Sequence, residues 1–119
     1  MIIATRTLTA ICKSGERRPV NLRVEAPVQE ADGRWRCWYE MDWPEDEGPA
    51  QTVRTSAVSG LDSLAAMQMA LMLLGSDLHF TSYHKEGRLY WHEGQVGYGV
   101  IVHKSAHDLL RGDDMEFLA

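Results

Sequence analysis

The chain has 119 residues, of which 45% are apolar and 24% charged, a composition typical of a soluble globular protein with a core of its own. Its 12 basic and 17 acidic residues give a formal net charge of -5, which argues against binding to nucleic acids or to anionic membranes. The sequence contains neither a membrane-length apolar run nor a signal peptide, so we expect a cytoplasmic protein with a single domain over residues 1–119.

Two cysteines are too few for a disulfide framework. Cys12 and Cys37 both fall at strand positions that are expected to face the core. We therefore interpret them as buried free thiols rather than as a disulfide or as nucleophiles.

Four strands are predicted in the first half of the chain, over residues 2–12, 20–26, 34–42 and 51–58. The second strand is the clearest example, since Val20, Leu22 and Val24 alternate with polar residues until Pro27 ends it. The turns between the strands are short, which favours an antiparallel meander.

A long core helix follows the fourth strand. Asp62 or Ser63 is suited to cap its N-terminus. Gly75 weakens its interior slightly, so the helix ends there or continues to about Tyr83. A core stripe is expected at three- and four-residue steps, widened by Met69, Met72 and Leu73; the stripe consists of Leu64, Met67, Leu71, Leu74 and Leu78.

The chain after this helix is less regular. Residues 88–92 predict a short strand, residues 96–103 are interrupted by glycines, and a short helix is expected from Ser105 to Leu110 before an acidic, frayed tail. Taken together, the pattern predicts a two-layer α+β fold, in which an antiparallel sheet of about four to six strands carries one long helix on one face.

The head of the helix carries the motif Gly60-Leu61-Asp62-Ser63-Leu64, and further characteristic segments lie at residues 6–8, 35–39 and 87–91. Together these segments resemble a family of small, single-domain bacterial proteins of uncharacterised function. The resemblance implies a bacterial origin and a stand-alone domain. It implies no activity, and it assigns no catalytic residue.

The residues that could take part in catalysis or metal binding give only weak signals. His103 and His107 are four apart, but Ser105 starts the helix between them and no third ligand has an identifiable place, so we expect no metal site. The glycines of residues 94–99 lack the lysine of a phosphate-binding loop, and a turn or bulge explains them better. We assign no cofactor and no catalytic residue.

An acidic loop, Glu45-Asp46-Glu47, lies between prolines. Adjacent acids in a loop are usually solvated, and attraction of a cation or a basic partner is the alternative. Ligands for calcium require a different spacing.

Strand parity points to a candidate binding surface. Arg23, Arg36, Trp38 and Arg54 fall on the face of the sheet opposite the helix, together with several acidic residues. A tryptophan among arginines is typical of an interface hot spot, and equally of a structural face held by cross-strand salt bridges. The chain after the helix is a further candidate to cover this face.

Two functions are compatible with these features. The first is a non-catalytic interaction module that binds a protein partner or forms a homodimer. By analogy, an acidic module that neutralises a basic partner, as immunity proteins do, is one form of it. The alternative is a hydrolytic or metal-dependent enzyme that uses histidine and acidic residues after the helix, because all five histidines lie between residues 79 and 107.

Overall fold

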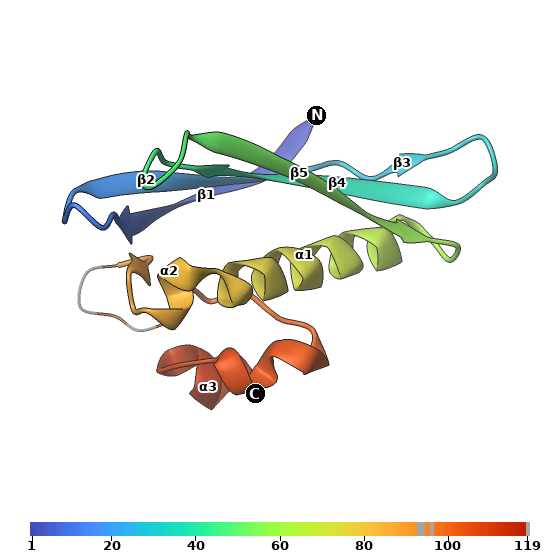
Figure 1. The fold of residues 1–119 in the computed structure, drawn as a ribbon. Helices are drawn as coiled ribbons and strands as arrows, with labels where there is room; N and C mark the ends of the chain where they lie inside the picture. The colour runs from blue at the N-terminus through green and yellow to red at the C-terminus, as the bar shows by residue number, and fades with distance from the viewer. Residues whose placement is uncertain (93–94, 96, 119) are drawn as a thin grey trace.

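The computed structural model describes residues 1–92, 95 and 97–118 and has an α+β fold (Figure 1). Its strands form one antiparallel sheet, against which the main helix packs, so the predicted fold class is confirmed. The strands are β1 (Ile2–Ile11), β2 (Arg17–Glu25), β3 (Val28–Gln29), β4 (Trp35–Trp43), β5 (Gln51–Ser59) and β6 (Leu89–Tyr90). The helices are α1 (Ser63–Phe80), α2 (Ser82–Lys85), the 3-10 helix η1 (Lys104–Leu109) and α3 (Asp113–Leu118).

The strands form the predicted meander around β4. β5 pairs with the whole length of β4 on one side, while β2 and the short β3 pair with successive parts of β4 on the other. β1 lies outside β2, and β6 adds only a two-residue pairing at Thr9 and Ala10 of β1. Pro27 stands at the break between β2 and β3, as expected for a residue that cannot donate to a ladder.

The period-two pattern sorts the side chains between the two faces of the sheet. Leu8, Val20, Leu22, Tyr39 and Met41 belong to the buried core beneath it. Cys12 and Cys37 are also buried and free, as predicted, and burial raises the pKa of the Cys37 thiol. The inner face of the sheet therefore supplies most of the core.

Helix α1 begins where the sequence predicts. The Asp62 side chain accepts a hydrogen bond from the Ala65 N–H at 2.8 Å, which satisfies a free donor of the first turn. The helix passes Gly75 and continues to Phe80. Among the described residues, no helix combines the length and apolar character that crossing a membrane requires.

The buried stripe of α1 differs from the predicted one. Leu64 is 55% exposed and Met69 is 40% exposed, so their placement in the core was wrong. Small residues take their place, since Ala66 and Ala70 are completely buried. Further along the helix Leu74 and Leu78 are buried as predicted, and the Tyr39 hydroxyl of β4 donates to Asp77 between them.

A third layer lies on the far side of α1. Figure 1 shows the C-terminal segment, with η1 and α3, beneath the helix and away from the sheet. The chain crosses α1 closely at Gly75, where a Cβ atom would lie 1.9 Å from the Ile101 carbonyl oxygen. The Ser76 hydroxyl accepts a hydrogen bond from the His103 N–H at 2.9 Å.

This arrangement decides which surface the C-terminal part covers. Residues 97–118 lie on the same side of the sheet as the helix, so the alternative that the chain after the helix covers the outer sheet face was wrong for these residues. The tail, expected to be frayed, forms α3 and places the buried Asp114 against the backbone of residues 98 and 99. The outer face has no described helix above it.

Candidate functional site

The predicted binding residues lie together on the outer face of the sheet. Arg23 of β2, Glu40 of β4 and Arg54 of β5 stand side by side in one cross-strand row. Trp38 lies next along β4, with the guanidinium carbon of Arg54 4.0 Å from its ring centroid and that of Arg36 at 5.5 Å. We call Arg23, Arg36, Trp38 and Arg54, with the carboxylates that they contact, the outer-face cluster.

Each arginine of this cluster pairs with a neighbouring carboxylate. Arg23 contacts Asp42 at 2.6 Å and Glu40 at 2.8 Å. Arg54 contacts Glu25 at 2.8 Å and Glu40 at 3.2 Å. The face therefore has the features of both an interface hot spot and a structural surface. It carries a tryptophan covered by arginines, and it also carries a ladder of cross-strand salt bridges.

The ion pairs stabilise the ionised forms of the carboxylates in this cluster. Hydrogen bonds from Arg23 and Thr52 lower the pKa of Asp42 to about 2, and hydrogen bonding to Arg23 lowers the pKa of Glu40. Arg36 adds a bond to Glu30 at 3.0 Å and one to the Ser56 hydroxyl at 2.6 Å. At neutral pH the cluster is therefore a fixed pattern of alternating charges, which is suited to recognition and offers no activated nucleophile or free base.

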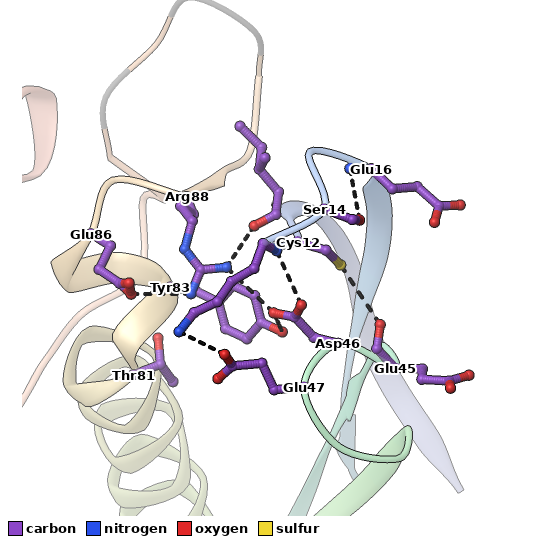
Figure 2. A network of polar contacts seen from close by, with 12 residues as sticks. Cys12, Ser14, Glu16, Glu45, Asp46, Glu47, Thr81, Tyr83, Glu86 and Arg88 are labelled. Carbon is purple, nitrogen blue, oxygen red and sulfur yellow. Dashed lines mark hydrogen bonds and ion pairs between the residues drawn. The ribbon is translucent and has the colours of Figure 1, made fainter.

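A second polar network surrounds the acidic loop (Figure 2). The Asp46 carboxylate accepts hydrogen bonds from the Lys13 N–H and from the Tyr83 hydroxyl, both at 3.0 Å, and lies 3.5 Å from Arg88. The backbone N–H of Lys13 is the main cause of the lowered pKa of Asp46. The expectation that this loop is simply solvated is therefore wrong for Asp46, although Glu45 and Glu47 are exposed.

This network borders a pocket of about 390 Å³ between the acidic loop, Lys13 and residues 81–83. Arg88 also donates to the Ile11 carbonyl at 2.7 Å and to Glu86 at 3.1 Å, and its guanidinium lies over the Tyr83 ring. Burial, reinforced by the bond to Asp46, raises the pKa of Tyr83 to about 12. These groups are largely occupied with one another, so they tie the acidic loop to the region after α1 rather than present themselves to a ligand.

The histidines after residue 78 do not form a shared surface site. His79 and His84 are buried with their ring centroids 4.5 Å apart, whereas the side chain of His103 caps η1. His103 thus lies outside the short helix, as expected. Among the described residues, no group of three or more histidine, cysteine, aspartate or glutamate side chains is arranged to hold a metal ion.

The buried pair is held in defined tautomers by backbone carbonyls, which only accept hydrogen bonds. His79 donates from Nδ1 to the Gly75 oxygen at 2.6 Å, and His84 donates from Nε2 to the Leu109 oxygen at 2.6 Å. The Tyr98 hydroxyl then donates to Nδ1 of His84. Nε2 of His79 is buried without a described hydrogen-bond partner, and burial lowers the pKa of both histidines.

Sequence reasoning missed Asp46, Tyr83, Arg88 and the pair of buried histidines as organised groups. Their contacts join residues that are 33 or more positions apart in the case of Asp46, and 25 in the case of His84 and Leu109. The only local signal was the pair of prolines that fixes the ends of the acidic loop.

Comparison with known proteins gives a family and no activity. No curated protein and no solved structure matches the chain. One family model, described as a domain of unknown function (DUF6968), matches residues 4–102, from β1 to the segment that crosses α1. This range contains the helix signature and all four residues of the outer-face cluster named above. The chain therefore belongs to the DUF6968 family of domains of unknown function.

Proposed function

We propose that the protein is a non-catalytic binding module that recognises a basic protein through the outer-face cluster. The observation that carries this proposal is the position of Trp38, which stands on a sheet face with no described helix above it and lies between Arg36 and Arg54. Tryptophan and arginine are the residue types most enriched at energetic hot spots of interfaces.

The cluster has the polarity of a non-obligate interface. One large apolar ring is surrounded by charged groups, whereas a permanent dimer usually buries a more continuous apolar surface. Its arginines are held by ion pairs, so little side-chain freedom remains to be lost when a partner binds.

Charge supports a basic partner. The four carboxylates that pair with the three arginines, Glu25, Glu30, Glu40 and Asp42, outnumber them, and the whole chain has a formal charge of -5. An acidic protein attracts a basic one over long range, which speeds association at low salt.

The experiment begins with affinity capture on the immobilised protein and ends with purified components. Each captured protein is purified, and its binding to the parent chain and to Trp38→Ala is measured by calorimetry at low and high salt. The expected result is a basic partner whose affinity falls with salt and drops about 30-fold or more when Trp38 is replaced.

Matched variants separate the cluster from general effects of charge and aromatic surface. Phe80→Ala removes an exposed aromatic ring at the end of α1, and Arg34→Glu reverses an exposed arginine outside the cluster. Both should bind the partner nearly as the parent does, whereas Trp38→Ala and Arg36→Glu should not. Equal binding by all four variants, or an acidic partner, contradicts the proposal. A dimer that Trp38→Ala converts to a monomer would instead identify a second copy as the partner.

A further inference from the structure

A pocket of about 300 Å³ lies on the opposite side of the sheet from the outer-face cluster. Its roof is the inner face of β1 and β2, including Leu22 and Val24. Leu71 and Leu74 of α1 form one wall, and the crossing segment, residues 99–101, forms another. This volume is at the lower end of the roughly 300–1,000 Å³ that is typical of small-molecule sites.

The pocket exists because α1 does not fill the space under all the strands. The helix packs on β4 and β5, so the first half of β1 extends beyond it. The segment after Tyr98 fills part of that gap, and its close crossing at Gly75 holds it against the helix. What remains is an apolar hollow beside an otherwise complete core.

Arg6 supplies the charged group of this pocket. It is half-buried, its Nη1 donates to the Tyr98 carbonyl, and its guanidinium carbon lies 3.7 Å from the centroid of the Trp91 ring. A Cβ atom on Gly99, which lines the pocket, would be 3.9 Å from Nη1 of Arg6. The cation is therefore fixed beside the hollow.

Among the described residues, Arg6 forms no ion pair with a carboxylate. The charge of Asp114 acts on Arg6 electrostatically. The two carboxylate oxygens of Asp114, however, already accept hydrogen bonds from the N–H groups of Tyr98 and Gly99, at 2.6 and 2.8 Å. Arg23, Arg36, Arg54 and Arg88, in contrast, each lie within 4.0 Å of a carboxylate oxygen. A half-buried guanidinium that has several N–H donors and forms no ion pair with a described carboxylate is well suited to an anionic ligand.

We infer that this pocket binds a small aliphatic carboxylate, with the carboxylate on Arg6 and the hydrocarbon chain between the leucines of α1 and the valines of the sheet and crossing segment. The apolar walls exclude a purely hydrophilic anion, because phosphate or sulfate would lose its hydration without gaining further donors. A medium-length hydrocarbon chain is favoured by the volume and gains affinity from each methylene group that it buries.

The test is a titration of the 119-residue chain with octanoate, followed by NMR of its methyl groups. The expected shifts are confined to methyl groups that line the pocket, chiefly those of Leu22, Val24, Leu71, Leu74, Val100 and Ile101. Octanoate should bind about fourfold more tightly for each methylene that it has beyond hexanoate. Octanol and octylamine should bind at least about tenfold more weakly than octanoate, because neither supplies a negative charge to Arg6.

Three substitutions, each checked for folding, test the site further. Ala4 is an exposed residue of β1 that lines the pocket, so Ala4→Phe should abolish binding, whereas Thr7→Phe, on the opposite face of the same strand, should leave it unchanged. Arg6→Gln should weaken octanoate at least about tenfold and octanol little. Urea denaturation of each variant confirms that it is folded.

Three outcomes overturn the inference. The first is the absence of methyl shifts up to the concentration at which octanoate forms micelles. The second is equal binding of octanoate and octanol, or octanoate binding that survives Ala4→Phe. The third is tighter binding of an acetylated tripeptide with a C-terminal leucine than of octanoate, because that would make the ligand a peptide terminus rather than a free aliphatic acid.

Discussion

Gly75→Ala tests whether the crossing segment is rigidly held against α1. On helix propensity alone this substitution should stabilise the protein by about 1 kcal/mol, since Gly75 lies within the helix. The added Cβ, however, would lie 1.9 Å from the Ile101 oxygen and 3.0 Å from its carbonyl carbon, against ordinary contacts that begin at 3.4 Å. The obstructing atoms belong to the backbone, so no side-chain rotation relieves the clash.

The crossing segment must therefore move away by roughly 1.5 Å, which is the difference between the 1.9 Å to the Ile101 oxygen and the 3.4 Å of an ordinary contact. Such overpacking typically costs about 1–3 kcal/mol. The retreat also loosens the hydrogen bond from His103 to Ser76, worth about 1 kcal/mol. After the gain in helix propensity is subtracted, we expect a net loss of about 1–3 kcal/mol in the free energy of unfolding.

Urea denaturation measures this loss, and hydrogen exchange followed by mass spectrometry locates it. Amides of residues 100–110 should exchange faster in Gly75→Ala, while those of β2 and β4 keep their relative order. Gly60→Ala is the matched control, because a Cβ there has no atom within 4 Å, and its stability should change by no more than about 0.5 kcal/mol. If Gly75→Ala is as stable as the parent and its residues 100–110 stay protected, the close crossing is refuted.

Two further predictions concern the polar groups after α1. Tyr83→Phe removes the hydroxyl that donates to Asp46 and should lower the free energy of unfolding by about 1 kcal/mol in urea denaturation, whereas Glu47→Ala, in an exposed ion pair, should leave the midpoint unchanged. Burial lowers the pKa of His79 and His84 below 6.5, so the unfolded chain binds protons that the folded chain does not, and stability should fall as the pH drops below 6.5. Between neutral pH and about pH 5, the free energy of unfolding from denaturation curves should fall by at most about 1.4 kcal/mol per pH unit for each histidine. His79→Leu should reduce this pH dependence, and an unchanged dependence in this variant would contradict the assignment.

The sheet was predictable because its signals are local. Each strand of the meander carries its own period-two alternation, and the cap at Asp62 acts on a residue three positions away. The same alternation predicts that Arg23, Arg36, Trp38 and Arg54 share one face of the sheet, and the strand pairing brings them together there. Local rules suffice where each element contacts its sequence neighbours.

The sequence was a weaker guide wherever distant segments meet. Gly75 was interpreted as a weak point of the helix, whereas it is the position at which a segment 26 residues later crosses closely. Leu64 was placed in the core because it fits the three- and four-residue steps of the stripe, but it is exposed, and Ala66 and Ala70 are the completely buried residues in this part of the helix. The close crossing at Gly75 does not follow from periodicity, since it depends on a backbone segment from elsewhere in the chain.

Alternation along β2 also makes the two proposed sites independently testable. Leu22 and Val24 face the pocket, while Arg23 between them faces outward and pairs with Asp42. A substitution on one face therefore leaves the side chains of the other in place. Trp38→Ala should not change octanoate binding, and Ala4→Phe should not change binding of a protein partner. If each variant impairs both octanoate binding and binding of the protein partner, the common cause is a damaged sheet, and unfolding measurements on the same samples will show it.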